Sequence, residues 1–420
     1  MKYLLKNKDK VVLEFEVILK RFSVGDNYKE AKVINAIQIQ REDNIPLQIN
    51  KENLNSSLTS WIMNRKAPNN RTFIEKILST LNKNKIEDFM DYIDISLGLS
   101  LNDSFWIIPS DKDYKWKDFN LYENEFSEAL ELVAFSGLSH KVSGLTSSPE
   151  YTTNGMLKKC WHREDNKIYL YKGNGDGFLR GGKEAYSEYY MAQIAEIMEF
   201  DFVPYDLKLF HNELASVCPI FTSENEGYMP IVVFISSDNR DKRGLELIEN
   251  IIKIYPEHKF FDLMLFDALI CNKDRHLGNF GMIVDNDTGK ILRPAPIFDN
   301  GMGIINIPSF KELSQIEEII SERKSFFGFS FKEQLQLFAQ QRHIPNLQKL
   351  SSFNFKRHEK YNLSEEWLAP IESHIQQRAK MALRFIEEKQ EQLIQDSTKS
   401  KESQNQDSIN LNIKKHKKHR

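Results

Sequence analysis

The sequence predicts an α+β fold in which strand-rich segments precede mainly helical ones. Short β-favouring runs, broken by glycines and by an Asn-Gly turn signal, dominate residues 106–240. Residues 241–390 instead carry apolar side chains at the spacing of buried helix faces. The chain has 420 residues, of which 40% are hydrophobic and 28% charged, so it can bury one large two-lobed domain or several ordinary domains.

The composition excludes several classes of protein. The formal net charge of -3 gives no global reason to bind nucleic acid or an anionic membrane. Three scattered cysteines form neither a disulfide framework nor a metal quartet, so we expect reduced thiols in a cytoplasmic protein. Charged residues interrupt the apolar pairs at the start of the chain, so we expect no signal peptide. No apolar run approaches the roughly 18 residues of a membrane-spanning helix.

Residues 1–105 are expected to form an N-terminal accessory region. The segment VVLEFEVILKRF at 11–22 alternates like a strand, whereas SLTSWIMNRK at 57–66 and FIEKILSTLN at 73–82 have helical patterns. The pattern leaves the role of this region open: it could recognise a substrate, bind a partner or cover the lobe that follows.

Residues 106–225 are expected to form a β-rich lobe. Asn154-Gly155 is a turn signal between two β-favouring triplets, at 151–153 and 156–158. The other elements expected here are, in chain order, a strand at 167–172, a helix from about 183 to 198, and a strand pair at 203–210 and 214–220.

Residues 226–395 are expected to form a helical lobe. The segment 259–271 is apolar on nearly all sides, which predicts a fully buried helix. A hairpin with strands at 280–284 and 290–292 should follow. The last long helix should begin near Ser364 and present this apolar stripe to the core: Trp367, Ile371, Ile375, Ala379, Ala382 and Ile386.

The polar residues 396–420, which end in KKHKKHR, are expected to form a disordered basic tail. Its lysines and histidines could touch nucleic acid or an acidic partner. A solvated tail is the favoured interpretation, and apart from this segment we expect no nucleic-acid partner.

Two segments of the helical lobe carry side chains of the kind that phosphoryl transfer needs. Cys271–Phe280 reads CNKDRHLGNF and follows the buried helix, and Pro296–Gly301 reads PIFDNG and follows the hairpin. Phosphoryl transfer needs a carboxylate that orients the attacking hydroxyl and accepts its proton, and oxygen ligands for Mg²⁺. Asp274 suits the first role, and Asn279 and Asp299 suit the second.

The spacing of these residues favours one shared cleft. Asp274 and Asn279 lie within one tight loop, and the hairpin returns Asp299 to the same cleft on a separate segment. Either motif alone is more often an ordinary surface loop or turn. Because the two motifs bracket a hairpin and follow a buried helix, the pair is far more specific, and it predicts an ATP- and Mg²⁺-dependent kinase.

The motifs D-R-H-L-G-N and F-D-N-G resemble the catalytic loop and the metal-binding segment of the HipA-like serine/threonine kinases. D-R-H-x-x-N is also similar to the loop of phosphatidylinositol lipid kinases, which share a protein-kinase-like fold. The segments SSPEYTTNGMLKKCW, IYLYKG and EAYSEYYMAQIA favour the HipA-like side. The resemblance covers residues 138–304 and implies a two-lobed kinase fold of HipA type with ATP between the lobes.

The resemblance also implies which cation contacts the phosphates. Lys172 closes the expected strand, where this fold places its ATP-phosphate lysine. A carboxylate from the next helix should hold that lysine: Glu188 is our choice, and Glu184 on the same helical face is its rival. Lys167 and Lys183 are weaker candidates for the lysine itself. Without the downstream loop, Lys172 would be taken for a solvated lysine at a strand end.

The phosphate-covering loop lacks a G-x-G-x-x-G signature. The candidate is the hydroxyl-rich segment 147–155, whose backbone N–H groups could hold phosphate, with contacts from Thr152, Thr153, Asn154 and Gly155. An ordinary polar hairpin loop is an equal alternative. Autophosphorylation of a serine in this loop inactivates HipA-like proteins, so the resemblance implies candidate phosphosites at Ser147, Ser148, Thr152 and Thr153.

The segment Cys218–Ser223 is expected to connect the lobes, with its backbone against the adenine edge and Phe221 against the ring. Pro219 lacks an N–H group and so removes one donor there. His276 should lie near the nucleotide and fix the shape of the catalytic loop rather than transfer a proton.

The leading interpretation is a protein serine/threonine kinase. It would be a toxin-like enzyme with an antitoxin or other regulatory partner, or an effector delivered into a host cell. A lipid or small-molecule kinase on the same fold is one alternative. A kinase-like module that binds nucleotide without turnover is another, and the presence of Asp274, Asn279 and Asp299 argues against it.

Overall fold

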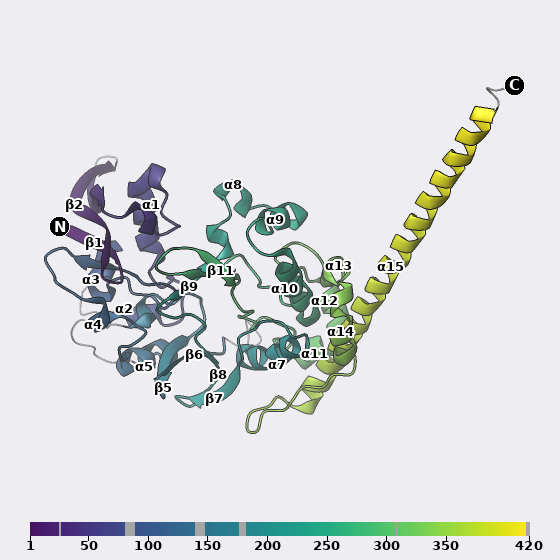
Figure 1. Ribbon diagram of the computed structural model, residues 1–420. Coiled ribbons are helices and arrows are strands. Elements are labelled where there is room, and N and C mark those ends of the chain that lie inside the picture. The colour runs from purple at the N-terminus through teal and green to yellow at the C-terminus, as the bar shows by residue number, and fades with distance from the viewer. Residues whose placement is uncertain (25–26, 80–88, 139–147, 176–181, 308, 417–420) are drawn as a thin grey trace.

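The structure is a computed structural model. It describes residues 1–24, 27–79, 89–138, 148–175, 182–307 and 309–416, with the backbone alone after Gln395. The α+β class is confirmed, because three antiparallel sheets occur with helices between and after them. Figure 1 shows the N-terminal region, the strand-rich lobe and the helical lobe following one another across the molecule. Among the described residues, no helix combines the length and the apolar character of a membrane span.

The N-terminal region is built on a four-stranded sheet of order β3-β2-β1-β4. Its elements are β1 (Lys2–Asn7), β2 (Lys10–Val24), β3 (Asn27–Ile39), α1 (Leu54–Asn64), α2 (Ile74–Ser79), α3 (Phe89–Ser96) and β4 (Phe105–Pro109). Alternate residues of β2, among them Leu13, Phe15 and Val17, face a core shared with α1 and α3. Because β4 pairs with β1, this sheet extends beyond the boundary that we expected at residue 105.

The strand-rich lobe contains a four-stranded antiparallel sheet of order β5-β6-β8-β7. Two helices precede the sheet and α7 follows β6, so that the elements are α4 (Trp116–Phe119), α5 (Glu128–Ser136), β5 (Lys159–Glu164), β6 (Lys167–Gly173), α7 (Glu184–Ile197), β7 (Asp206–Phe210) and β8 (Glu213–Pro219). The strands, helix and strand pair predicted between residues 167 and 220 are therefore confirmed in kind and order.

The hairpin turn of this lobe does not lie where the sequence suggested. Asn154-Gly155 precedes the sheet, and neither of the flanking triplets, 151–153 and 156–158, forms a strand: Pro149–Tyr151 is a 3-10 helix and β5 begins only at Lys159. The tight turn is Asp165-Asn166, whose φ values of 49° and 59° suit a two-residue connection between β5 and β6. Pairing across this turn buries Cys160 opposite Tyr171, and that burial decides between the two turn signals.

The helical lobe begins with a small sheet of order β11-β10-β9 and continues with helices around the buried α10. Its elements are β9 (Glu226–Pro230), α8 (Ser237–Arg240), α9 (Gly244–Ile251), α10 (Glu257–Ile270), β10 (Gly281–Asp285), β11 (Ile291–Pro294), α11 (Phe310–Ser314), α12 (Ile316–Glu322), α13 (Phe331–Phe338) and α14 (Ile344–Leu350). The predicted hairpin is therefore β10–β11, and the predicted buried helix is α10.

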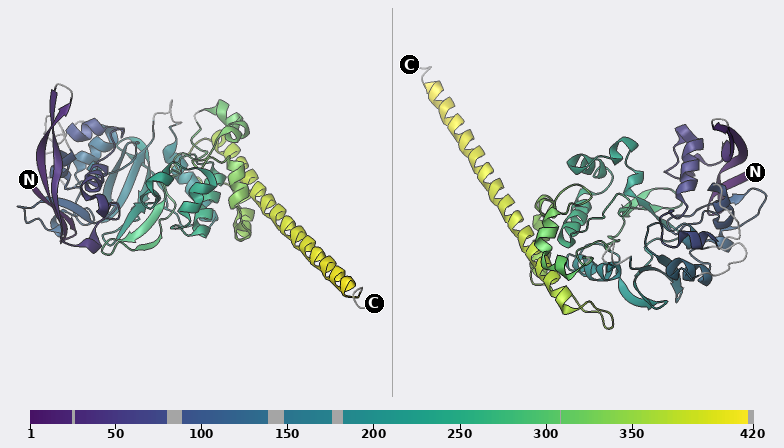
Figure 2. Two further views of the ribbon diagram at one scale, coloured as in Figure 1. Left: turned by 90° about the horizontal axis from the view of Figure 1, so that it is seen from above. Right: turned by 180° about the vertical axis from the view of Figure 1, so that it is seen from behind.

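The last helix, α15 (Glu365–His416), begins beside Ser364 and buries its predicted apolar stripe. Residues 396–416, for which we expected a disordered tail, continue α15. No glycine or proline follows Pro370, so the two strongest helix breakers are missing from this part of the sequence. Figures 1 and 2 show this part of α15 projecting away from the body of the molecule.

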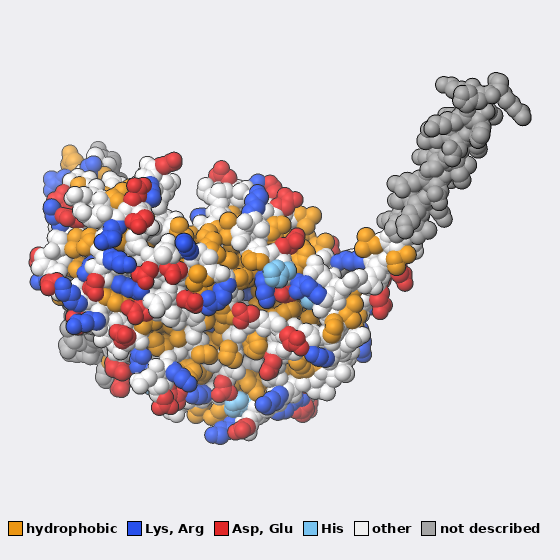
Figure 3. Space-filling view, viewed as in Figure 1, with side chains coloured by type: hydrophobic (Ala, Val, Ile, Leu, Met, Phe, Trp, Pro, Cys, Tyr) orange, Lys and Arg blue, Asp and Glu red, His pale blue; other side chains and the backbone are white. Residues whose placement is uncertain are grey.

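The surface carries both signs of charge. Figure 3 shows acidic and basic side chains interspersed over the face drawn, without a large patch of one sign. This agrees with the small formal net charge of -3. This face therefore offers no broad basic surface to nucleic acid.

Candidate active site

A cleft of about 460 Å³ lies where the strand-rich lobe, the helical lobe and the N-terminal region meet. Strands β6 and β8, the segment after β8 and two loops of the helical lobe contribute to its walls. All but one of the residues predicted for the site line this cleft: Thr152, Thr153, Asn154, Gly155, Lys172, Phe221, Asp274, His276, Asn279 and Asp299. The exception, Glu188, is buried behind Lys172.

Lys172 contacts two carboxylates from different segments. Its Nζ lies 2.5 Å from Oε1 of Glu188 on α7 and 2.7 Å from Oδ1 of Asp299. Glu184, the rival partner, instead accepts a hydrogen bond from the N–H group of Gly175 at 3.1 Å. The structure therefore brings Lys172, Glu188 and Asp299 into one cluster.

The electrostatics of this cluster favour the charged forms of Lys172 and Asp299, whereas burial raises the pKa of Glu188. Burial by itself would lower the pKa of Lys172, but the carboxylates of Asp299 and Glu188 raise that pKa above its ordinary value. Burial would likewise raise the pKa of Asp299, but Lys172 and Lys159 hold it well below its usual range. We therefore expect an ammonium group and an ionised Asp299 at neutral pH.

The loop after α10 is shaped by the buried Arg275. The helix ends at Cys271, whose left-handed backbone, with φ of 54°, turns the chain toward the cleft. Nε of Arg275 lies 2.9 Å from Oδ2 of Asp267, and Nη1 donates to the carbonyl of Asn279 at 2.8 Å. Nη2 donates to Oδ1 of Asn300 at 3.0 Å. Arg275 thus ties the catalytic loop to α10 and to the second motif.

Asp274 and Asn279 are held so that side-chain oxygens stay available. Nδ2 of Asn279 donates to the carbonyl of Asp274 at 2.9 Å, which leaves Oδ1 of Asn279 without a hydrogen-bond partner among the described residues. The carboxylate of Asp274 accepts no hydrogen bond from the part of the chain that the structure describes. Partial burial and the nearby Asp299 raise the pKa of Asp274, which suits a proton acceptor.

Asp299 has an unusual backbone. Its φ of 59° lies in the left-handed region, which aspartate adopts more readily than most residues but at an energetic cost. The N–H group of Asp299 donates to the hydroxyl of Tyr205 at 3.1 Å, and that of Asn300 donates to Oε2 of Glu188 at 2.8 Å. These bonds hold the strained segment, and the Asp299 carboxylate meets Lys172 in the cleft.

The oxygens of this site fit a magnesium ion. Mg²⁺ binds carboxylate and amide oxygens and keeps several waters, so it needs few protein ligands. Asp299 and Asn279 offer one carboxylate and one amide oxygen in the same cleft, near Asp274. Within the described residues, no cluster of three or more His, Cys, Asp or Glu side chains could hold a metal. One carboxylate and one amide oxygen suit a metal that takes its remaining oxygens from waters and a phosphorylated ligand.

The segment 148–155, the candidate phosphate loop, is anchored by contacts that sequence reasoning did not anticipate. The hydroxyls of Thr152 and Thr153 each donate to a backbone carbonyl at 2.7 Å. Arg71 from the N-terminal region forms a fully buried ion pair with Glu150, with 2.5 Å between Nη2 and Oε2. Because Arg71 lies far from the loop in sequence, no local pattern could have revealed it.

Lys159 is a cleft residue that the sequence analysis missed. It begins β5 directly opposite Lys172 on β6, and both lysines line the cleft. Its Nζ donates to the carbonyl of Asn154 at 2.9 Å. Burial, with the neighbouring Lys172, lowers the pKa of Lys159 to about 7. Phosphate anions would favour its charged form, so Lys159 is a second candidate for phosphate contact. The sequence signal that could have revealed Lys159 is the Asp165-Asn166 turn, because a hairpin at this turn pairs Lys159 with Lys172.

Aromatic rings and a histidine complete the cleft. The ring of Phe221 lies 5.3 Å from that of Phe298 and 5.6 Å from that of Tyr228, measured between centroids. Nδ1 of His276 accepts a hydrogen bond from the N–H group of Gly278 at 3.0 Å, which shapes the catalytic loop. Phe221 and His276 are therefore both placed at the cleft.

No protein-family model and no curated protein matches the sequence. Among solved structures, the chain is similar to HipA of a toxin–antitoxin system from Shewanella oneidensis MR-1, solved with HipB and operator DNA. The TM-score is 0.49 and the identity 11%, over 92% of this chain and 98% of that one. It is also similar to the Helicobacter pylori proinflammatory kinase CtkA, with a TM-score of 0.44 and 18% identity over 56% of this chain and 93% of that one. A HipA protein is thus among these neighbours, and the HipA-like kinases are the family that the sequence motifs resemble.

Proposed function

We propose that this protein is an ATP- and Mg²⁺-dependent kinase of the HipA-like type, which transfers the γ-phosphoryl group to a serine or threonine hydroxyl of a protein. The observation that carries the proposal is the meeting of Asp274, Asn279 and Asp299 with Lys172 in one cleft. The cleft, at about 460 Å³, has the size of a small-molecule site. The resemblance of D-R-H-L-G-N and F-D-N-G to the HipA-like motifs supports the same conclusion.

In the proposed reaction, Asp274 orients the acceptor hydroxyl and takes its proton as the oxygen attacks the γ-phosphorus. Lys172 and Lys159 contact oxygens of the phosphates. Asn279 and Asp299 would hold Mg²⁺, which neutralises negative charge on the phosphates when it is bound. The bond from the acceptor oxygen to the γ-phosphorus forms as the bond to the β-phosphate oxygen breaks, and ADP leaves.

Replacing Asp274 tests the proposal most directly. With radiolabelled γ-phosphate, we expect Asp274→Ala to lower transfer to protein by about 100- to 10,000-fold, the contribution of a positioned general base. The matched control is Asp241→Ala, an exposed aspartate outside the cleft, which should transfer phosphate as the wild type does. Equal transfer by Asp274→Ala and the wild type would contradict the proposal.

The same assay separates the alternatives. Label found only on added phosphatidylinositol would favour a lipid kinase that shares the D-R-H-x-x-N loop. ATP binding without any transfer would favour a nucleotide-binding module. The Asp274 carboxylate, which accepts no hydrogen bond from the described residues, argues against the module, because binding without turnover needs no proton acceptor at that position.

The resemblance extends the proposal to autophosphorylation. It also extends it to an antitoxin or other regulatory partner, and to a protein that acts in the cytoplasm or in a host cell. Ser147 lies outside the described residues. Oγ of Ser148 accepts a hydrogen bond from the loop backbone at 3.4 Å, and Thr152 and Thr153 donate to carbonyls. A phosphate on any of these three would disrupt a bond within the loop or to its anchor, which would favour its release. Mass spectrometry after incubation with ATP would identify the modified residue.

A further inference from the structure

The N-terminal region reaches the cleft through the segment 99–103, which lies between α3 and β4. Ser100, Leu101 and Asn102 line the cleft together with the residues that follow β8. The catalytic motifs and the proposed mechanism make no use of this segment. Its side chains are therefore candidates for a contact that the phosphate-binding residues do not make.

Hydrogen bonds to the carbonyls of Leu101 and Asn102 hold this segment against its surroundings. The hydroxyl of Thr222, which follows β8, donates to the carbonyl of Leu101 at 2.6 Å. The hydroxyl of Tyr122 donates to the same carbonyl at 3.0 Å. The N–H group of Tyr228 donates to the carbonyl of Asn102 at 2.8 Å. The backbone at Asn102 is therefore fixed relative to the connection between the lobes.

Gly227 on β9 permits this close approach. A Cβ atom at this position would lie 2.6 Å from the carbonyl oxygen of Asn102, closer than real Cβ contacts. It would also meet Oδ1 of Asn286. Glycine has no Cβ atom, so Gly227 allows β9 to lie in tight contact with the N-terminal region.

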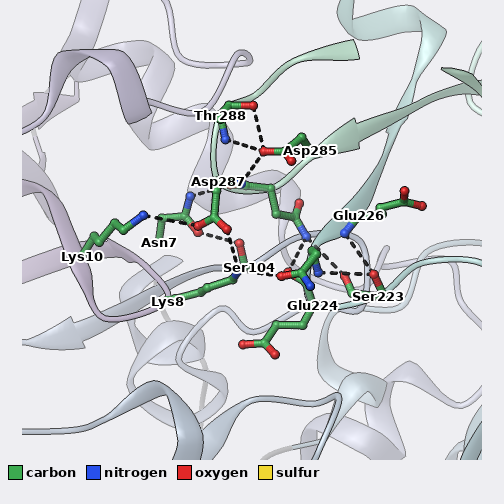
Figure 4. A network of polar contacts seen from close by, with 12 residues as sticks. Asn7, Lys8, Lys10, Ser104, Ser223, Glu224, Glu226, Asp285, Asp287 and Thr288 are labelled. Carbon is green, nitrogen blue, oxygen red and sulfur yellow. Dashed lines mark hydrogen bonds and ion pairs between the residues drawn. The ribbon is translucent and has the colours of Figure 1, made fainter. Parts of the chain in front are cut away.

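A polar network holds the same region to the helical lobe (Figure 4). Nδ2 of Asn7 donates to the carbonyl of Asn286 at 2.6 Å, and the hydroxyl of Ser104 donates to Oδ1 of Asn7 at 2.5 Å. Nδ2 of Asn286 donates to the carbonyl of Glu224 at 3.0 Å. Because Ser104 closely follows Asn102, this network fixes the segment from its other end.

Asn102 is half-buried and lines the cleft, and its side chain has no hydrogen-bond partner among the described residues. An asparagine amide offers two N–H donors and a carbonyl acceptor. These groups match the edge of a purine base, and asparagine binds adenine in this way in the major groove of DNA. An unpaired amide on a fixed backbone at a cleft wall is suited to such a ligand.

We propose that Asn102 hydrogen-bonds the nucleobase of bound ATP. The inference rests on the proposed kinase function, in which the phosphates meet Lys172 and Lys159 and the base lies against the segment after β8. The N-terminal region is then part of the nucleotide site, and not only a cover for the strand-rich lobe.

Equilibrium binding of Mg·ATP, Mg·2′-deoxy-ATP and Mg·tripolyphosphate to the full chain tests this proposal. Asn102→Ala should weaken binding of both nucleotides by about 3- to 10-fold, the effect of one lost hydrogen bond or slightly more. Binding of tripolyphosphate, which has no base, should not change. The matched control is Asn55→Ala, at an exposed asparagine of α1, which should bind all three probes as the wild type does.

Other results overturn the proposal. Unchanged ATP affinity in Asn102→Ala would remove the contact, and equal weakening of ATP and tripolyphosphate would indicate a general distortion of the cleft. Weaker binding of ATP but not of 2′-deoxy-ATP would assign the contact to the ribose. Failure of the proposed function can be told apart from failure of this contact. If the protein is not a kinase, the wild type itself transfers no phosphate in the radiolabel assay, whatever the affinities of the variants.

Discussion

The candidate catalytic loop after α10 and the candidate phosphate loop before β5 are both anchored by a buried arginine–carboxylate pair, but from different distances along the chain. Arg275 and Asp267 are 8 positions apart, whereas Arg71 and Glu150 are 79 positions apart. The catalytic loop thus carries its own support. The phosphate loop depends on the N-terminal region, because Arg71 also donates to the carbonyl of Lys159 at 2.8 Å.

This difference explains which half of the site could be recognised from a short stretch of sequence. When the supporting residues lie on the same or an adjacent segment, the loop and its support form one motif, as in D-R-H-L-G-N. When the support comes from another region, the loop itself needs no strict pattern. The lack of a G-x-G-x-x-G signature before Lys172 is consistent with a phosphate loop that is held in place from outside.

The largest expected effect on stability comes from removing either arginine. Arg275→Met leaves Asp267 buried without a cation, and Arg71→Met does the same to Glu150. Each variant should lower the free energy of unfolding in urea by about 3–5 kcal/mol. If the two loops differ as described, Arg275→Met should mainly lower kcat, whereas Arg71→Met should mainly raise the KM for ATP.

A surface ion pair provides the control for both arginines. Arg293 pairs with Glu226 at an exposed position, and such pairs contribute about 0–1 kcal/mol, so Arg293→Met should change stability little. The distinction between the loops would be lost if Arg275→Met and Arg71→Met changed kcat and KM in the same proportion.

A smaller loss of stability is expected from Gly227→Ala, which places a methyl group against the N-terminal segment. Overpacking of this kind costs about 1–3 kcal/mol, which thermal or urea unfolding would measure. The KM for ATP should rise, because the N-terminal wall of the cleft must move, and kcat should change less. An alanine variant as stable as the wild type would show that the contact between β9 and Asn102 is not tight.

Lys159→Met should raise the KM for ATP by about 10-fold, equivalent to about 1.4 kcal/mol, with a smaller change in kcat. The pKa of Lys159 is lowered to about 7 by burial and by Lys172, so its ammonium loses its proton above that pH in the free protein. Only the charged form attracts phosphate, so wild-type affinity for ATP should fall as the pH rises from about 6 to about 9.

The variant itself supplies the control for this pH dependence. Lys159→Met has no group to titrate at that position, so its affinity should change less over the same pH range. Lys208→Met, at a partly exposed lysine outside the cleft, should behave as the wild type does. Parallel pH profiles for the wild type and Lys159→Met would exclude Lys159 as the titrating group.

The smallest effect is expected at the exposed contact between the N-terminal region and the β10–β11 turn (Figure 4). Asp287 lies 2.9 Å from Nζ of Lys8 and 3.4 Å from Nζ of Lys10. Asp287→Asn should lower the free energy of unfolding by less than about 1 kcal/mol, and less in high salt, because solvent screens these pairs. A loss as large as that of Arg71→Met would mean that this contact anchors the N-terminal region as strongly as the buried pair does.

The sequence alone determined the α+β class, the buried helix before the catalytic loop, the β10–β11 hairpin and the grouping of Asp274, Asn279 and Asp299. These predictions depend on short-range physics: apolar periodicity, turn residues, a tight loop that holds Asp274 and Asn279, and a hairpin that returns Asp299 to it. The contact of Lys172 with Glu188 came from the resemblance, which supplied a strand followed by a helix, and the structure places these two side chains together.

Only the tertiary structure decided how distant segments meet at the cleft. Asn154-Gly155 and Asp165-Asn166 are both plausible turns, and the pairing of β5 with β6 chose the second, which set Lys159 opposite Lys172. The approach of Asn102 to the cleft and the burial of Arg71 beneath the phosphate loop depend on packing between separate regions of the chain. Such contacts leave no periodic or local pattern, because each partner alone is an ordinary polar residue and gains its role only when folding removes it from water.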